Sequence, residues 1–169
     1  MNKVNNSVIF KIWVIILLII IPNFNHAKEI LIYADNISYD EDENIIARGN
    51  AKIFQKNQLI ISDIIIYNRL EEKIILPSNF VFKDENNNYY EGENGYFFKN
   101  LNFSEFYNPK IRLNDGSRII GNKFKRNNNI DIVSKGVYSP CQSRIKIGNF
   151  ICPTWQLEGE KILHDNENL

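Results

Sequence analysis

The chain has 169 residues, 44% hydrophobic and 24% charged, and its 20 basic and 20 acidic side chains give a formal net charge of zero. A nucleic-acid binder needs a surplus of basic side chains to displace counterions from phosphates, so this balance argues against that class of protein. The abundance of Ile, Phe and Tyr favours β-strands over helices, and the length fits one domain with or without an additional tail.

The first segment differs in composition from the rest. Lys3 and Lys11 accompany an apolar run over residues 12–21, and a short polar spacer then leads to Ala27. This order is typical of a secretory signal, so we predict a signal peptide at 1–27 that is cleaved after Ala27. The run is shorter than the roughly 20 apolar residues that a spanning helix needs. An uncleaved anchor is the alternative, and in either case the remainder is exported.

Past the signal, apolar residues recur at a period of two between short turns of Asn, Asp, Glu and Gly, which predicts strands and no amphipathic helix. The fold class is therefore predicted to be all-β. The predicted strands, in chain order, are 30–34, 36–39, 45–54, 58–62, 64–67, 73–76, 79–83, 89–92, 95–99, 103–107, 110–113, 117–121, 130–133 and 137–139. An alternating stretch that starts at Trp155 adds a final strand, and the open edge beyond it favours pairing with another strand.

A repeat becomes visible when the acidic or amide residue that opens each unit is aligned. Asp35, Asp63, Glu93 and Asn122 follow one another at spacings of 28, 30 and 29 residues, and each comes after a small residue. Each unit contains two strands and cannot bury its own apolar face. Consecutive units are therefore predicted to stack into a solenoid-like sheet.

The strand over residues 45–54 has one apolar face with several small residues, whereas its other face carries Arg48, Asn50 and Lys52. Small inward residues leave room between two sheets, so we predict an apolar groove that holds a ligand. The alternative is an ordinary sandwich core with no cavity. The predicted groove residues are Ile45, Ala47, Ala51, Ile53, Ile64, Ile66, Phe80, Phe82, Ile111, Leu113 and Ile119.

The sequence offers little for catalysis. It has no Gly-rich phosphate loop, no nucleophile elbow, and no His placed to act on a Cys. The acidic run at 40–43 lacks the alternate ligand spacing and the Gly of a calcium loop, so it is predicted to be a turn. His26 and His164 are predicted to be solvated. We therefore predict no catalytic residue, no metal, no cofactor and no enzymatic activity.

The two cysteines, Cys141 and Cys152, suit an oxidising compartment. A disulfide between them closes a short loop and contributes up to about 3 kcal/mol. Two free thiols, or pairing with cysteines of another chain, are the alternatives. Their spacing does not match a four-ligand zinc site.

Several motifs resemble those of a known family. "YADNISYDEDENIIARGNAKIF" (33–54) and "LIISDIIIYN" (59–68) look like the repeated pattern of the OstA-like domains of lipopolysaccharide transport, which the LptA, LptC and LptD families share. More narrowly, "GVYSPC" (136–141) and "CPTWQLEGEKILHD" (152–165) resemble the amino-terminal periplasmic part of the LptD family in its alphaproteobacterial form. The resemblance covers about residues 30–165.

This resemblance implies an open, V-shaped β-jellyroll of stacked hairpins at 28–140 and a cysteine-containing tail at 141–169. In the LptD family a membrane barrel follows, and this chain is expected to lack it. The groove is expected to carry the lipid A acyl chains of lipopolysaccharide, as part of a bridge toward the outer membrane. The implied location is the periplasm, in association with the outer membrane.

The implied partners are lipopolysaccharide, an LptA-like bridge domain joined by edge pairing, an outer-membrane lipoprotein and a barrel, with no nucleic acid. Two other functions are compatible with the sequence. One is a structural adaptor that joins partner domains edge to edge without binding lipid, and the other is an LptA-like or LptC-like component.

Overall fold

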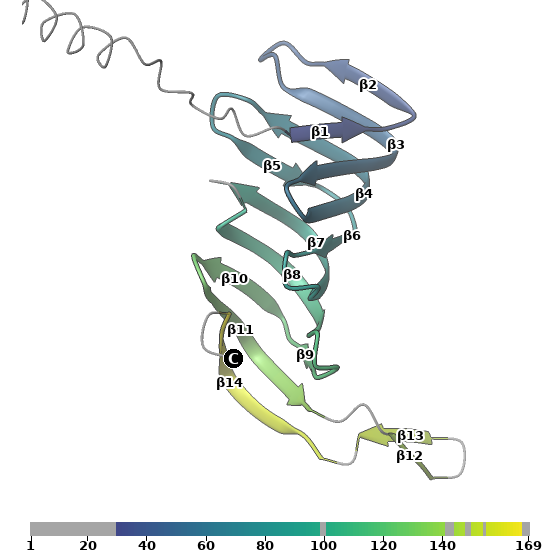
Figure 1. Cartoon of the computed structure of the whole chain (residues 1–169), viewed down its shortest axis with the longest axis vertical. Coiled ribbons are helices and arrows are strands. Elements are labelled where there is room, and N and C mark those ends of the chain that lie inside the picture. Colours follow the sequence, from purple (N-terminus) through teal and green to yellow (C-terminus); the bar gives the residue numbers. More distant parts are fainter. Residues whose placement is uncertain (1–29, 99–100, 141–143, 148–149, 154, 167–169) are drawn as a thin grey trace, which may run out of the picture.

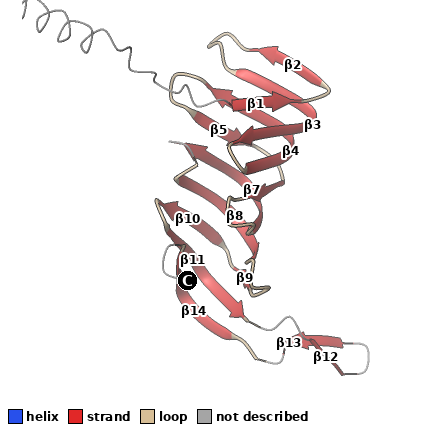
Figure 2. Ribbon diagram, in the orientation of Figure 1, coloured by secondary structure: helices blue, strands red, loops and turns tan. Residues whose placement is uncertain are grey.

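The structure is a computed structural model, and it describes residues 30–98, 101–140, 144–147, 150–153 and 155–166. Every regular element in these ranges is a β-strand (Figure 2). The strands are β1 (Ile30–Tyr33), β2 (Asn36–Tyr39), β3 (Ile45–Gln55), β4 (Gln58–Asn68), β5 (Lys73–Leu76), β6 (Phe80–Lys83), β7 (Tyr89–Phe98), β8 (Phe103–Arg112), β9 (Arg118–Ile120), β10 (Lys123–Asn127), β11 (Ile130–Ser139), β12 (Arg144–Ile147), β13 (Phe150–Pro153) and β14 (Leu157–Asp165).

One twelve-stranded antiparallel sheet contains all described strands except the hairpin β12-β13. Nine of its strands follow the order β1-β3-β4-β5-β7-β8-β10-β11-β14, and β2, β6 and β9 pair with strands of this path. The strands lie one after another along the long axis of the molecule, and the hairpin projects from the C-terminal end (Figure 1). The all-β class and the stacking of consecutive units are thus confirmed.

The sheet is folded into two walls. The first half of β3 pairs with β2 and its second half pairs with β1. In the same way β4 and β7 each pair with both β5 and β6, and β8 and β11 each pair with both β9 and β10. We call the wall that contains β2, β5 and β10 the first wall, and the wall that contains β1, β6 and β9 the second wall. The long strands run through both walls and bend between them.

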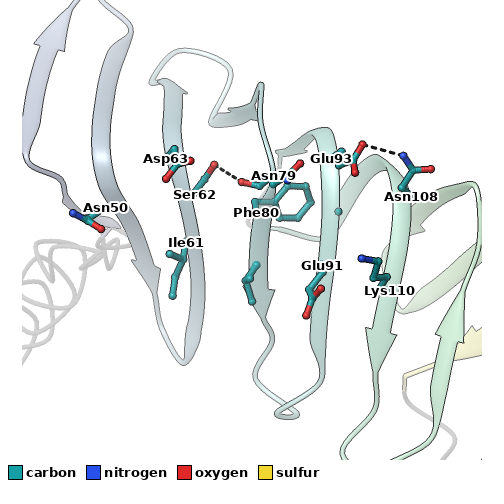
Figure 3. A pocket seen from close by; sticks show the side chains of 12 residues that line it. Asn50, Ile61, Ser62, Asp63, Asn79, Phe80, Glu91, Glu93, Asn108 and Lys110 are labelled. Atoms are coloured by element: carbon teal, nitrogen blue, oxygen red, sulfur yellow. Dashed lines mark hydrogen bonds between the residues drawn. The ribbon is translucent and has the colours of Figure 1, made fainter. Parts of the chain in front are cut away.

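The bend lies at polar residues with a left-handed backbone. Asn50 in β3, Asn94 in β7 and Asn108 in β8 have φ values of 47°, 45° and 50°. Asn tolerates this conformation better than other residues with a side chain. Asn50 Nδ2 donates to Asp35 Oδ2 at 2.8 Å, and Asn108 Nδ2 donates to Glu93 Oε2 at 2.9 Å. The repeated acidic or amide residues therefore lie at one bend in each unit, as Glu93 does beside Asn94. Asn50 and Asn108 lie at the bends between them, and neither set of bends was predicted from the sequence (Figure 3).

We expect Asn108→Ala to lower the free energy of unfolding by about 1–2 kcal/mol, because alanine disfavours a left-handed backbone and cannot bond to Glu93. Asn108→Gly keeps the backbone freedom and loses only the side-chain contact, so a smaller loss is expected. Urea unfolding of the two variants measures the difference. Equal losses would show that the left-handed backbone at residue 108 adds nothing to the cost.

The bend also changes which residues face inward. In β4, Ile60 and Ser62 are buried, but the next buried residue is Ile65, whereas Ile64 and Ile66 are half-buried. Strict alternation along residues 58–68 predicts one face for all of them, and the bend breaks that alternation. Ile45 is also half-buried, and the other predicted groove residues are buried.

Six aromatic side chains fill the space between the walls in the middle of the stack, and each is at most 3% exposed. Phe80 of the second wall packs on Phe106 of the first wall with ring centroids 5.1 Å apart, and Phe82 packs on Phe97 at 5.0 Å. Tyr90 and Phe124 complete the cluster at 5.6 Å. The filled-core alternative therefore describes the middle of the stack.

The predicted strands agree with most of the strand positions in the structure but not with their continuity. β4, β7, β8 and β11 were each predicted as two strands, and each is one strand that continues through the bend. β10 was missed because Phe124 is its only apolar residue. The signal peptide at 1–27 and Cys141 lie outside the described residues, as does the side chain of Cys152, so the predicted disulfide also lies outside them.

Candidate ligand-binding site

A partly open cavity of about 430 Å³ lies at the C-terminal end of the stack, and residues of both walls line it. Its volume falls in the range of about 300–1,000 Å³ that is usual for ligand pockets. The apolar residues that line it are Leu113, Ile119, Tyr138, Leu157, Ile162 and Leu163. The polar residues that line it are Asp115, Ser117, Glu158, Lys161 and His164.

The interior side chains are smaller at this end of the stack. Phe124 on β10 is the last ring of the aromatic cluster, and beyond it the buried residues of β11 are Asp131, Val133 and Gly136. A Cβ atom at Gly136 would lie 2.6 Å from Ile162 Cδ1, so glycine lets β11 and this side chain of β14 approach closely. The ring-filled interior therefore gives way to a space whose apolar lining is aliphatic except for Tyr138.

Only Leu113 and Ile119 of the predicted groove residues line this cavity. Most of the others lie in the filled core described above. The residues that β11 and β14 contribute to the cavity, such as Tyr138 and Ile162, were not predicted from the sequence. The alternation of apolar and polar residues after Trp155 predicted the last strand. It did not predict that this strand lines a cavity, because alternation does not show what a strand packs against.

His164 was predicted to be solvated, and this prediction is wrong. Its side chain is 11% exposed, and its Nδ1 lies 3.9 Å from Asp131 Oδ2, which is too far for a hydrogen bond. Its place on β14, opposite Asp131 of β11, turns it inward. The burial of His164 could not be predicted from its position in a polar segment, because it depends on the pairing of β14 with β11.

A buried polar network joins the two walls beside the aromatic cluster. Arg126 Nε donates to Asp131 Oδ1 at 2.6 Å, and Arg126 Nη2 donates to Asp131 Oδ2 at 2.8 Å and to Tyr90 Oη at 2.7 Å. Tyr90 Oη lies 3.0 Å from Asp84 Oδ2, which it reaches as a donor. Arg126 and Asp131 belong to the first wall, whereas Tyr90 and Asp84 belong to the second, so the network ties the walls together near the strand-end turns.

The charges in this network are settled by burial and pairing. Burial raises the pKa of Asp131, but the hydrogen bonds from Arg126 outweigh it and hold the pKa below its usual value. Burial raises the pKa of Tyr90 far above its usual value. Near neutral pH, Asp131 is therefore ionised and Tyr90 is neutral, so Arg126 and Asp131 form a structural ion pair.

A second hollow, of about 320 Å³, lies along the bend (Figure 3). Asn50, Asp63, Asn79, Glu93 and Asn108 lie in a row across successive strands there. Several of these polar groups satisfy one another or the backbone; for example, Ser62 Oγ donates to the carbonyl oxygen of Asn79 at 2.9 Å. The row therefore stabilises the bend, and the apolar end cavity is the better candidate for a ligand.

The described residues contain no group of three or more His, Cys, Asp or Glu side chains that is arranged to hold a metal ion. Within the same residues, no helix has the length and apolar character needed to span a membrane.

No family model matches the chain, and no curated protein matches it. Among solved structures, it is similar to LptH from Pseudomonas aeruginosa, described as the LptA homologous periplasmic component of the conserved lipopolysaccharide transport device. The TM-score is 0.50 at 15% sequence identity, over 58% of this chain and 75% of LptH. The chain has the LptA-like β-jellyroll fold.

The LptA-like match confirms the predicted fold class. At this level of identity the match shows the fold alone, and it does not distinguish the LptD family from its LptA and LptC relatives.

Proposed function

We propose that this chain is a domain of a periplasmic lipopolysaccharide-transport bridge, and that its end cavity holds an acyl chain of lipid A. The observation that carries the proposal is an apolar cavity of about 430 Å³ at the open end of an LptA-like stack. The location in the periplasm, the association with the outer membrane and export by the signal at 1–27 belong to the same proposal.

Acyl binding in this cavity is driven by the removal of CH₂ groups from water, at about 0.8 kcal/mol for each group. The aromatic cluster fills the middle of the stack, so the lipid occupies the C-terminal end and not the whole length of the interior. The sugar part remains in water outside the walls. Each domain therefore holds only part of a lipid, and a neighbouring domain covers the rest.

The sheet edges support a bridge. β14 pairs with β11 along Leu157–Asp165, and among the described residues no strand pairs with its outer edge. An unpaired edge of this length is a template for a strand of another domain. We propose an LptA-like domain as the partner at such an edge. In an LptD-type arrangement, a barrel and an outer-membrane lipoprotein would be further partners. The division into 28–140 and 141–169 is part of this proposal, although β14 itself completes the main sheet.

A structural adaptor without lipid is the second candidate, and the filled aromatic core is the observation that favours it. The two functions differ in what contacts the end cavity. An adaptor leaves the cavity empty or covers it with protein, whereas a transport domain brings lipid into it.

Photocrosslinking in cells tests the choice. We expect a benzophenone side chain at Tyr138, which lines the cavity, to form adducts with lipopolysaccharide. The same group at Tyr39, which is 67% exposed on β2, is the matched control and is expected to form none. Adducts with protein alone at position 138 would contradict lipid binding and favour the adaptor.

A further inference from the structure

A row of basic side chains runs across the outer face of the second wall. Lys83 on β6 pairs in register with Tyr89 on β7, Tyr89 pairs with Arg112 on β8, and Arg112 pairs with Arg118 on β9. These residues are the last or the first of their strands, so the row lies beside the strand-end turns and away from the bend. Arg112 and Arg118 are both exposed.

The cations in this row have no described carboxylate as an ion-pair partner. Arg112 Cζ lies 4.6 Å from the centroid of the Tyr89 ring, and Lys83 Nζ lies 5.6 Å from it. The ring therefore holds the two cations near each other without neutralising them. On the first wall, by contrast, Lys123 Nζ lies 2.7 Å from Glu105 Oε1.

Arg112 and Arg118 are direct cross-strand partners, and like charges in that position destabilise a sheet. The chain as a whole is neutral, so this local excess of positive charge is not a general property of its surface. An anion that binds both guanidinium groups removes the repulsion. Guanidinium groups bind phosphate oxygens through two parallel hydrogen bonds, which makes phosphate the best-matched anion.

The row also lies next to the end cavity. Leu113, which follows Arg112, and Ser117 and Ile119, which flank Arg118, all line that cavity. Arg112 and Arg118 thus lie on the outer face of the second wall, and their sequence neighbours line the cavity on the inner face of the same wall. The short β8–β9 turn, where the Leu113 amide donates to the Ser117 carbonyl at 2.9 Å, is the rim between the two faces.

We infer that Arg112 and Arg118 form a binding site for the phosphate groups of an amphiphile's headgroup, at the rim of the cavity that takes its acyl chain. The acyl part of this inference rests on the proposed function, whereas the phosphate part does not. Tyr89 orients Arg112 by stacking, and Lys83 extends the positive row to a second phosphate.

The test measures phosphate binding with and without acyl chains. The probes are an acyl-free glucosamine disaccharide with two phosphates, inorganic phosphate, and lipid A with two phosphates or one. Binding of the water-soluble probes is followed by chemical-shift changes in the NMR spectrum, and binding of lipid A by fluorescence. The variant is Arg112→Gln with Arg118→Gln, and the control is Lys52→Gln with Lys125→Gln, which removes the same charge at other exposed positions.

We expect the arginine variant to bind the bisphosphorylated disaccharide at least 10-fold more weakly than the parent chain, and the control to differ by less than 2-fold. The parent is also expected to prefer lipid A with two phosphates, and the variant to lose that preference. Inorganic phosphate is expected to compete for the same site at higher concentration. Circular dichroism of the variant checks that it is folded.

Two results would overturn the inference. One is equal binding of the disaccharide by the parent and the arginine variant, and the other is binding of the parent to anionic phospholipid vesicles but not to the disaccharide, which indicates a membrane-facing surface. If the disaccharide binds through the arginines while lipid A gives no acyl-dependent gain, the phosphate site stands and the proposed acyl function fails.

Discussion

Asp131→Ala is expected to lower the free energy of unfolding by about 3–5 kcal/mol, because it leaves the buried guanidinium of Arg126 without its carboxylate. Asp131 is 1% exposed and Arg126 is 6% exposed, so water does not replace the lost partner. The side chain of Asp131 also touches Tyr90 of the opposite wall, with 3.1 Å between Tyr90 Oη and Asp131 Oδ2. Urea unfolding at neutral pH measures the loss.

A variant that removes both charges is the control. Arg126→Met with Asp131→Leu replaces the ion pair by apolar groups, and such replacements are often close to neutral. We therefore expect the double variant to be more stable than Asp131→Ala alone. If Asp131→Ala costs less than about 1 kcal/mol, the network does not tie the walls together as we infer.

The same ion pair makes the parent chain sensitive to acid. The pKa of Asp131 is lower in the folded chain than its ordinary value of 3.8, so folding favours the ionised carboxylate. Its contribution is complete above the unfolded pKa and is lost as the pH falls below it toward the folded pKa. In Asp131→Asn this part of the pH dependence should be absent, and unfolding curves between neutral pH and about pH 3 show whether it is.

Phe106→Ala is expected to cost about 3–5 kcal/mol, because it removes the ring at the centre of the aromatic cluster. Phe106 is fully buried and stacks on Phe124 with centroids 4.4 Å apart. A Cβ atom at Gly92 would lie 2.3 Å from Phe106 Cδ2, so the opposite wall is already in close contact with this ring. Phe106→Leu keeps part of the volume and is expected to lose less.

The same substitution also tests why the middle of the stack is closed. If aromatic rings alone exclude a hydrocarbon tail, Phe106→Ala opens the interior beyond the end cavity, and a fluorescent fatty acid should bind the variant more tightly than the parent. Thermal unfolding in the presence of that ligand reports both effects. If the free energy of unfolding of Phe106→Ala is close to that of the parent, the two walls have moved together to fill the space of the missing ring. The ring is then not needed to hold the walls apart.

Under the proposed function, the positions of the end cavity and the aromatic cluster suit a chain of domains. The filled middle of the stack would keep the walls fixed, and the end cavity, which β14 lines, lies beside the free edge of β14, where we propose that a neighbouring domain docks. This division of the interior follows from the order of side chains along the stack, with the aromatic cluster ending at Phe124 and a mainly aliphatic apolar lining, apart from Tyr138, beyond it.

Much of the fold was predictable because it depends on local sequence. Alternation of apolar and polar residues placed the strands, and the recurrence of Asp35, Asp63, Glu93 and Asn122 located the repeated units, although it did not predict that the chain bends at these residues. β10 escaped prediction because its second inward residue is Arg126, whose partner Asp131 cannot be recognised from spacing. The inward side of β4 was also mispredicted beyond the bend, where Ile65 and not Ile64 or Ile66 is buried.

The sequence by itself determined an all-β chain of repeated two-strand units, since strand periodicity and turn residues act over a few neighbouring positions. Only the tertiary structure decided that the aromatic rings fill the middle, that Arg126 and Asp131 join Tyr90 across the walls, and that the cavity lies at the β14 end. These contacts join residues far apart in the chain, such as Tyr90 and Asp131. They exist only once the units have stacked in one register, which no local pattern specifies.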